Sequence, residues 1–581
     1  MQSRTPRWQL SRRRLVQLIG ATASATLIQA CSSAPATPTA APAKPAEAPK
    51  PAAPAASPAA SPAASPAASP AAAAPAAAQP AAAAKPSGPA VTLTIAIDSD
   101  PQSLDPSTNL AYPVGSEIIV NVFDTLVAWK APKFDQLEGR LAESWEISPD
   151  GKVYTFKLRS GVMFHDNTPC DAAAVKAAME RVKADNTFMT AYYGPIESIE
   201  APDPRTVKIS LKAPSAVFLS QLAVPQAAIH SPTNAKALSK EQIGAKPVGT
   251  GPFKFESYTP DTEVVLSANP SYFRGAPTVQ RLVYRVIKDQ ATRRLELEKG
   301  TVDVVQQNGN LFSLPIADID ALKKNKDVKV LEFESQIIRN IDFDNADGTA
   351  GVMTDKRVRQ AIALAIDYDG LLAGVLGGTA SRVYGPLTQS SWAVLPEAQS
   401  LAPKRDVARA KALLAEAGQS NLALKMYTFQ GSSWRDIGTF LQANLAEAGI
   451  KAEVVQLEFP ALRQLHTAGE HDIALDGRQP WYNDPDAHIT IGYLSSLGNT
   501  ALTLRMPKNA ELDGLIEKAQ QTTKLEDRKQ LYYDIQKRLM DFQPGVYLFS
   551  PKVIVYTRAN IDNLVPNTAP PLTEYWQVKK S

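Results

Sequence analysis

The sequence predicts an α/β fold that begins near residue 91, and three observations support this prediction. Residues 91–97 alternate large apolar side chains with smaller or polar ones, as a strand with one buried face does. Further along, Val358, Ile362 and Ile366 fall on one helical stripe. Strand and helix patterns then alternate through residues 406–459 with short connections, which predicts helices layered on a sheet.

The first thirty residues are predicted to be an export signal. A basic region precedes an apolar and small-residue run at residues 15–30, and Cys31 follows. The run is shorter than the ~20 residues a spanning helix needs, and no later run approaches that length, so no transmembrane helix is expected in the mature chain. Residues 11–16 resemble a twin-arginine signal, and residues 28–31 resemble a bacterial lipobox, in which the chain is cut before Cys31 and the thiol is acylated. The general secretory route stays open as an alternative.

Residues 31–90 are predicted to form a disordered linker behind the lipidated Cys31. They consist almost only of Ala, Pro and Ser, which supply too little large apolar surface to offset the ordering entropy. At ~3.1 Å per residue in a polyproline conformation, such a linker reaches well over ~100 Å. We therefore expect a protein tethered by a lipid to the outer face of the cytoplasmic membrane, in the periplasm or at the cell surface.

The charge balance and the cysteine content argue against a nucleic-acid-binding protein and against a disulfide-bonded one. The chain has 61 Lys and Arg against 58 Asp and Glu, and without the five arginines of residues 1–30 the count is 56 against 58. That balance argues against a nucleic-acid partner. With Cys31 acylated, Cys170 has no cysteine to pair with, and it is expected to be a small packed or half-exposed residue rather than a reactive thiol.

The opening half of the globular part is strand-rich. The segment after Trp145 turns at residues 148–151, where Pro, Asp and Gly favour a turn, and the next strand places Tyr154, Phe156 and Leu158 on one face.

The later half alternates helices with strands. A helix over residues 355–377 is expected to end at Gly377, and a second runs from Asp406 to Gly418. After these helices the sequence predicts a strand at residues 422–429, a helix at 433–449 opened by a capping pair of Ser433 and Asp436, and a strand at 450–459.

Three stretches together resemble the extracellular solute-binding proteins of ABC importers, family 5, which include dipeptide, oligopeptide and nickel binders. They are residues 141–175, 246–305 and 358–378, in the order and spacing of that family. The resemblance covers roughly residues 91–581. It implies a two-lobed periplasmic-binding-protein-like fold of the Venus-flytrap type (type II, cluster C), with an extra small α+β domain and no enzymatic activity.

The resemblance also implies how the domains are arranged and what the protein does. Lobe I is expected at residues 91–134, 246–343 and 547–581, the accessory domain at 135–245, and lobe II at 344–546. The lobes of such a protein close on a peptide-sized organic solute by hinge bending, and the ligand then passes to the ABC permease in the membrane. The protein is expected to act as a monomer without a cofactor.

The resemblance places the ligand near residues 474–491. Peptide-binding members carry an acid three positions before an Asp-Pro pair, where it holds the ammonium group of the ligand. Here that pair is Asp484-Pro485, and the position holds Trp481. A buried ammonium without a carboxylate is costly, so peptides remain candidates only if another acid, such as Asp476 or Asp484, replaces the anchor. The Trp481-Tyr482 pair suits stacking on a sugar face, an apolar ring or a cation, although Trp481 packing at the lobe edge is an alternative.

Other ligand-binding residues are carried over from the pocket-lining segments of the family. Arg382 is the best partner for a ligand carboxylate or phosphate oxygen, because its fork bonds two oxygens at once. The full predicted ligand-binding set is Tyr112, Arg382, Tyr384, Trp434, Trp481, Tyr482 and Asp484.

Two functions of other classes are alternatives to a solute receptor. In a cell-surface enzyme His165-Asp166 would be the obvious pair, but neighbours on a strand point to opposite faces, and no HExxH or GxSxG motif occurs. A receptor for a nickel complex or other metal chelate would use His466, His471 or His488. His466 and His471 are five apart, the wrong spacing for one helix face, so no metal site is predicted.

Overall fold

The computed structural model describes residues 91–108, 113–134, 136–185, 189–306, 313–348, 351–497 and 505–581. All of them belong to the compact unit Ala82–Ser581. The predicted export signal, Cys31 and the linker lie outside the described residues, as does Tyr112. Among the described helices, none has the length and apolar character needed to span a bilayer.

The largest sheet has seven strands and mixes parallel with antiparallel pairs. Its central strand β1 runs parallel to both of its neighbours, and the strand predicted over residues 91–97 is confirmed, although Ala96 on the opposite face is also fully buried, in a second core. Leu93, Ile95 and Ile97 are fully buried and pack with Ile118 and Val122 of α2. The order is β12 (Val328–Phe333), β19 (Val553–Arg558), β11 (Val304–Val305), β1 (Thr92–Ile97), β10 (Arg281–Val286), β9 (Glu263–Ala268) and β8 (Phe253–Thr259).

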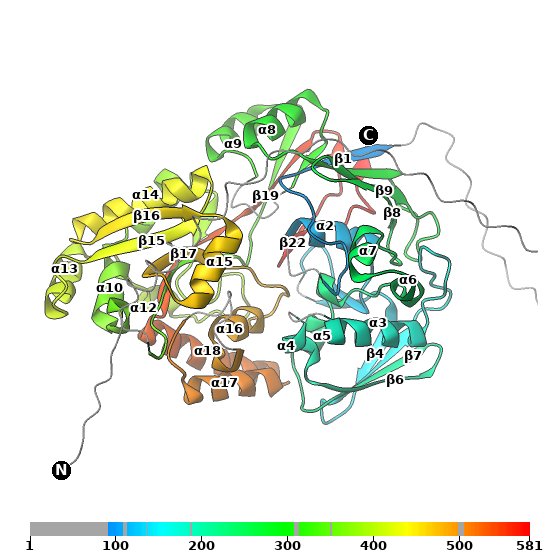
Figure 1. The fold of residues 1–581 in the computed structure, drawn as a ribbon, viewed down its shortest axis with the longest axis horizontal. Coiled ribbons are helices and arrows are strands. Elements are labelled where there is room, and N and C mark those ends of the chain that lie inside the picture. Colours follow the sequence, from blue (N-terminus) through cyan, green and yellow to red (C-terminus); the bar gives the residue numbers. More distant parts are fainter. Residues whose placement is uncertain are drawn as a thin grey trace, which may run out of the picture. The chain divides into compact units, whose positions relative to one another are not determined.

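A second sheet has six strands and carries helices from the later half of the chain. The parallel pair β15 and β16 is joined by α14, which packs along both strands, as the alternation of patterns predicts (Figure 1). The order is β14 (Ala380–Arg382), β18 (Gly545–Pro551), β13 (Ile338–Phe343), β17 (Ile473–Arg478), β15 (Ala423–Phe429) and β16 (Lys451–Leu457).

A four-stranded antiparallel sheet is built from residues 142–211. The turn and the two strands predicted around it are confirmed, and Tyr154, Phe156 and Leu158 are buried in one core with α3. The order is β4 (Ala142–Ile147), β5 (Val153–Leu158), β7 (Thr206–Leu211) and β6 (Ile196–Asp203). Two-stranded ribbons pair β2 (Val127–Trp129) with β3 (Leu137–Gly139), β20 (Ile561–Asp562) with β23 (Lys579–Lys580), and β21 (Asn567–Thr568) with β22 (Pro571–Leu572).

Helices cover these sheets and connect them. The longest, α18, packs against α17, which in turn contacts α16. The described helices are α2 (Pro113–Val122), α3 (Ala172–Asp185), α4 (Thr190–Tyr193), α5 (Phe218–Gln221), α6 (Pro232–Ala237), α7 (Lys240–Ala245), α8 (Gln290–Lys299), α9 (Ile319–Lys324), α10 (Lys356–Ala365), α11 (Tyr368–Gly370), α12 (Ala398–Leu401), α13 (Val407–Glu416), α14 (Ser432–Glu447), α15 (Phe459–Ala468), α16 (Asp486–Tyr493), α17 (Ala510–Gln521) and α18 (Leu525–Phe542).

Two of the predicted helix ends are wrong. The helix predicted over residues 355–377 stops at Ala365, because the Asp367 side chain accepts from Gly370 N and starts a new turn. A short π-helix at residues 371–375 follows. The predicted capping pair of Ser433 and Asp436 is absent, since α14 begins at Ser432 and its N-cap residue is Gly431, which has no side chain to bond the first turn.

Packing between α2 and the loop before β8 predicts a sharp contrast between two glycines. A Cβ on Gly249 would lie 2.2 Å from Val122 O and 2.6 Å from Phe123 Cδ1, so Gly249→Ala should lower the free energy of unfolding by about 1–3 kcal/mol. Gly514 lies within α17 with open space around it, so Gly514→Ala should raise that free energy by about 0.5–1 kcal/mol. Urea unfolding of the two variants measures both effects. Equal responses would contradict this account of the packing at Gly249.

Candidate functional site

The segment after β17 holds three of the predicted ligand-binding residues. Gln336, which lies just before β13, holds this segment in place. Its side chain donates to Asn483, and its carbonyl oxygen lies 2.7 Å from His488 Nε2. Asn483 also donates to Phe134 O, next to the β2–β3 ribbon. The segment therefore contacts residues that lie 147 and 349 positions earlier in the sequence.

Tyr482 is placed as a core residue. It is fully buried, donates to Asp486 at 2.7 Å, and meets the Tyr192 ring edge-on at a centroid distance of 5.6 Å. Together with Trp481 it belongs to the same core as the four-stranded sheet. A ligand contact from Tyr482 finds no support in this geometry.

Asp484 is held in a buried ion pair. Arg528 of α18 donates to both of its oxygens, at 2.6 and 2.8 Å, and also to Tyr532 at 2.8 Å. Burial opposes the charge of Arg528, but the attraction of Asp484 outweighs it and raises the arginine pKa. Both carboxylate oxygens are used, so Asp484 fixes the segment rather than offering a charge to a ligand.

Trp481 lines a pocket of about 390 Å³, which we call the Trp481 pocket. Its walls come from the β2–β3 ribbon, α2, Ala223–Ala228 and the C-terminal segment. Trp481 itself is 7% exposed. The aromatic and charged residues of the wall are Phe123, Trp129, Phe134, Trp481, Trp576, Asp124, Glu138, Arg140, Arg274 and Glu574.

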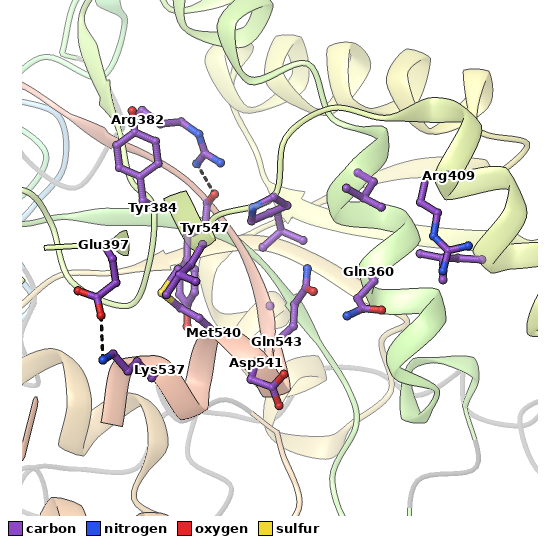
Figure 2. Close-up of a pocket in the computed structure, with 16 residues that line it drawn as sticks. Gln360, Arg382, Tyr384, Glu397, Arg409, Lys537, Met540, Asp541, Gln543 and Tyr547 are labelled. Atoms are coloured by element: carbon purple, nitrogen blue, oxygen red, sulfur yellow. Dashed lines mark hydrogen bonds and ion pairs between the residues drawn. The ribbon is translucent and has the colours of Figure 1, made fainter. Parts of the chain in front are cut away.

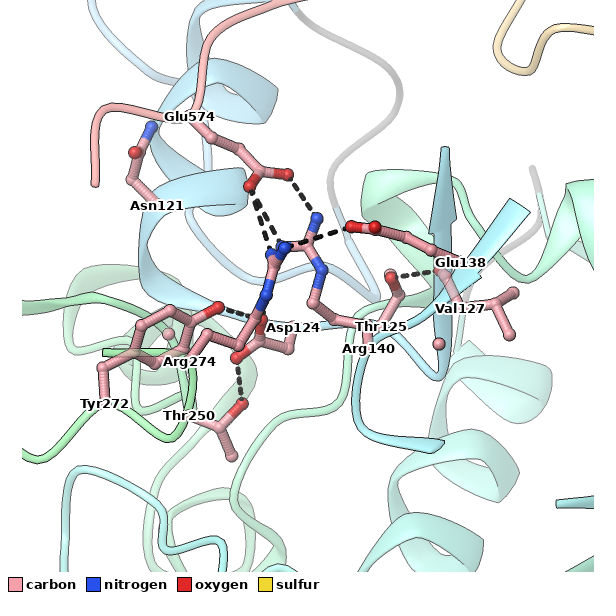
Figure 3. A network of polar contacts seen from close by, with 12 residues as sticks. Asn121, Asp124, Thr125, Val127, Glu138, Arg140, Thr250, Tyr272, Arg274 and Glu574 are labelled. Atoms are coloured by element: carbon pink, nitrogen blue, oxygen red, sulfur yellow. Dashed lines mark hydrogen bonds and ion pairs between the residues drawn. The ribbon is translucent and has the colours of Figure 1, made fainter. Parts of the chain in front are cut away.

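A network of charges lies along one wall of this pocket (Figure 3). Arg140 donates to both oxygens of Glu574, at 2.8 and 3.0 Å, and lies 3.5 Å from Asp124. Arg274 bridges Glu138 at 3.1 Å and Glu574 at 3.9 Å, with its guanidinium 4.9 Å from the Trp576 ring centroid. Figure 3 shows Glu574 facing both guanidinium groups.

The buried and the accessible ends of the network differ. Burial raises the pKa of Asp124, although Arg140, Thr250 and Tyr272 all stabilise its charge. The side chains of Glu138, Glu574 and Arg274 are 30%, 35% and 22% exposed. Opposite charges are thus available at the pocket wall without being sealed from solvent.

Arg382 and Tyr384 line a different pocket, of about 770 Å³, between α10, α13, α18 and β18 (Figure 2). One Arg382 nitrogen, Nη1, donates to Tyr547 O at 2.6 Å and Leu548 O at 2.8 Å, and the guanidinium lies 3.5 Å from the Tyr368 ring centroid. Within the described ranges no carboxylate lies within 4.0 Å of it, and burial lowers its pKa. Neither residue is brought to the Trp481 pocket.

Trp434 is also separate from the Trp481 pocket. It is 5% exposed, packs edge-on against Phe429 at 5.1 Å, and lies 5.3 Å from the Arg339 guanidinium. The predicted set is therefore dispersed: Trp481 reaches one pocket, Arg382 and Tyr384 another, and Trp434 neither of them. The ligand roles of these residues stay predictions.

The charged wall of the Trp481 pocket is not predicted by the sequence. Arg140 and Glu574 are 434 residues apart, and no local pattern joins them.

His165 and Asp166 each have their own partner. His165 Nε2 lies 2.9 Å from Gly251 O, and burial lowers the pKa of the ring to about 4. Asp166 accepts from Ser231 and Thr168, both at 2.6 Å. The pair anchors loops, as expected from two neighbours that point apart.

The Asp484–Arg528 pair supplies a test of how the Trp481 segment is held. Asp484→Asn leaves the buried Arg528 without its anion, so the free energy of unfolding should fall by about 3–5 kcal/mol. The exposed Lys524–Asp527 pair is the matched control, and Asp527→Asn should change it by less than about 1 kcal/mol. Urea unfolding at neutral pH compares the two, and similar losses would refute the structural role of Asp484.

Residues 136–499 match the family model described as bacterial extracellular solute-binding proteins, family 5 Middle. A probable D,D-dipeptide-binding periplasmic protein of Escherichia coli K12 is 29% identical over 482 residues, which cover 79% of this chain and 89% of the relative. Heme-binding protein A of Haemophilus influenzae is 30% identical over 452 residues, covering 71% and 79%.

Solved structures agree on the fold. The periplasmic binding protein DppA of Helicobacter pylori, in complex with a peptide, superposes with a TM-score of 0.74 at 25% identity, covering 84% of this chain and 98% of that one. The predicted periplasmic-binding-protein fold is confirmed. The chain belongs to the bacterial extracellular solute-binding proteins of family 5.

Proposed function

We propose that this protein is the receptor of an ABC importer that captures a short peptide or another peptide-sized zwitterion in the Trp481 pocket and passes it to the membrane permease. Family membership supports the class, and the D,D-dipeptide-binding and peptide-bound relatives support the kind of ligand. The single observation that carries the ligand assignment is the paired carboxylates and guanidinium groups on the wall of a pocket lined by Trp481.

The charges of this wall match the two ends of a zwitterion. A peptide carries an ammonium and a carboxylate, and each needs an opposite charge once it leaves water. Glu138 and Glu574 serve the ammonium, while Arg274 serves the carboxylate through its planar fork. These three groups are partly exposed, so a ligand reaches them by exchanging partners within an existing network.

The two acids that the sequence offered as substitutes are already engaged. Arg528 occupies Asp484, and Arg463 donates to both oxygens of Asp476 at 2.5 and 2.8 Å. Glu138 and Glu574 therefore replace them in the proposal. Trp481 contributes a π surface that attracts the ammonium or covers an apolar side chain.

The proposal includes no catalytic step. The family consists of solute-binding proteins. The His165 ring lies within hydrogen-bond distance of Gly251 O, and Asp166 accepts hydrogen bonds from Ser231 and Thr168. A monomer with a mobile hinge is sufficient for capture and release. The proposed domain boundaries place the seven-stranded sheet in lobe I and the four-stranded sheet in the accessory domain. They divide the six-stranded sheet, because β14 to β17 come from the lobe II segment while β13 and most of β18 come from the lobe I segments.

The N-terminus completes the proposal. Residues 1–30 act as the export signal, Cys31 carries the lipid, and the Ala/Pro/Ser linker through residue 90 keeps the receptor near its permease while it samples the medium. The linker composition and the position of Cys31 directly after the apolar run support this arrangement.

Ligand class and the role of Trp481 are tested together by thermal unfolding. Di- and tripeptides, opines, sugars and metal chelates are screened with the full chain, and a ligand at 100 times its Kd should stabilise it by about 2.7 kcal/mol. We expect peptides or opines to act and neutral sugars to fail. Trp481→Ala should weaken binding at least about tenfold, because an aromatic contact of about 1.5 kcal/mol is lost.

Trp145→Ala is the matched control, because it removes a half-buried tryptophan of β4 that lies outside both pockets. It should leave the affinity unchanged. Glu574→Gln should weaken ammonium-bearing ligands more than their N-acetylated forms. Stabilisation by sugars alone, or full affinity in Trp481→Ala, would overturn the proposed ligand class.

The anchor is tested by cell fractionation. Wild-type protein expressed with its own N-terminus should sediment with membranes and release only with detergent, whereas Cys31→Ser should appear in the soluble exported fraction. Cys170→Ser is the control, since that buried thiol is far from the signal in sequence and should leave the partition unchanged. Equal membrane association of wild type and Cys31→Ser would exclude lipid anchoring through this residue.

A further inference from the structure

Two buried polar side chains of α2 hold the backbone of the C-terminal segment. Glu117 and Asn121 are both fully buried and lie four residues apart, so they share one face of the helix. Glu117 Oε2 accepts from Thr573 N at 2.9 Å. The Asn121 amide donates to Thr573 O at 2.8 Å and accepts from Tyr575 N at 2.8 Å. Backbone groups on both sides of Glu574 are therefore bound by one helix.

The alternation of side chains along this segment turns Glu574 toward the pocket. Thr573 and Tyr575 are fully buried, whereas the Glu574 side chain between them is 35% exposed and lines the pocket wall. Leu572 and Trp576, two positions away on either side, line the same wall. Side chains of an extended segment point alternately to opposite sides. The backbone bonds at residues 573 and 575 therefore decide where the carboxylate of residue 574 lies.

The same helix also fixes the other end of the Glu574 side chain. Arg140 donates to both oxygens of Glu574, and it lies 3.5 Å from Asp124, which follows α2 by two residues. Ile119 and Val120, on other faces of the helix, line the pocket directly. A change in how α2 holds the C-terminal segment would therefore move the carboxylate relative to the rest of the wall.

Glu117 serves this contact as a hydrogen-bond acceptor. Burial raises the pKa of its carboxyl to about 8, although the hydrogen bond from Thr573 N favours the charged form. At neutral pH the group is thus mostly an uncharged acid. A glutamine at this position has nearly the same shape and keeps an oxygen that accepts from Thr573 N.

We propose that Glu117 and Asn121 are positioning residues for the Trp481 pocket, which hold the Glu574 carboxylate where it meets the ligand ammonium and so set the preference for solutes with a free amine. The inference rests on the proposed function, because it takes Glu574 as the partner of that ammonium. Neither side chain is among the described residues that line the pocket, so both act through the backbone of residues 573–575. Charge-assisted hydrogen bonds weaken steeply when distance and direction change.

Matched ligands test the inference by calorimetric titration of the full chain. The probes are alanyl-alanine, in its L,L and D,D forms, and the N-acetyl derivative of each. Wild type should bind a free dipeptide at least about tenfold more tightly than its acetylated form, because a hydrogen bond to a charged group is lost. Asn121→Ala should weaken the free dipeptide at least about tenfold and the acetylated form less than about twofold. A general loss of stability would weaken both alike.

Conservative and distant variants separate positioning from packing. Glu117→Gln should keep the preference for the free dipeptide, whereas Glu117→Ala should reduce it. Asn444→Ala is the matched control, since Asn444 is another buried amide of a helix and its Oδ1 accepts from Asp367 N at 2.7 Å. It should leave the preference unchanged. Circular dichroism checks folding, and Asn121→Ser replaces Asn121→Ala if the latter unfolds.

A double variant distinguishes failure of this inference from failure of the proposed function. Asn121→Ala added to Glu574→Gln should cause no further loss of preference, because the carboxylate that Asn121 positions is gone. A preference that Glu574→Gln abolishes but Asn121→Ala and Glu117→Ala leave intact overturns this inference alone. A wild type that binds neither form, or both equally, overturns the proposed function as well.

Discussion

The two large sheets are joined by a pair of crossing segments, and the rest of the structure depends on how these are held together. One segment leads from β12 into β13 and the other from β18 into β19. Ser335 Oγ donates to Pro551 O at 2.5 Å, and Ser550 Oγ donates back to Ser335 O at 3.1 Å. Residue 336, next in the chain, holds the Trp481 segment through Asn483 and His488. A movement of these crossing segments would therefore shift the segment that carries Trp481. Capture of a ligand between two lobes requires such a coupling between the hinge and the pocket.

Local pattern predicted most of the elements but few of their ends. The alternation at residues 91–97 and the strand–helix–strand succession around α14 were sufficient, because periodicity reports which face is buried. The break after Ala365 was missed because Asp367 competes for a backbone amide, an effect that apolar periodicity does not register. The order of strands in either large sheet was beyond reach, since β19 lies between β12 and β11 after more than two hundred intervening residues.

The candidate site was predictable only where a family motif marks it. Trp481 was found because it stands at a fixed distance from Asp484-Pro485, and it does line a pocket. Asp484 looked equally suitable, but its role is decided by Arg528, 44 residues away, which no local pattern reveals. Arg382 likewise turns to backbone carbonyls and the Tyr368 ring. A charged residue in a sequence is a candidate ligand group until its partner is known, and partners are set by the tertiary fold.

The same dependence on the tertiary fold applies at Trp481, which stands where the peptide-binding members of the family carry an acid. Replacing an acid by Trp481 removes one negative charge, and binding of an ammonium survives only if the fold supplies another nearby. Glu574 and Glu138 come from segments that the motif does not include, and both reach the pocket that Trp481 lines. Because each is already paired with an arginine, neither carboxylate is an isolated charge, and the proposed zwitterionic ligand would replace both partners at once. A ligand with only an ammonium would take the carboxylates of Glu138 and Glu574 and leave the Arg274 guanidinium without an anion. The proposed site therefore favours solutes that carry both charges.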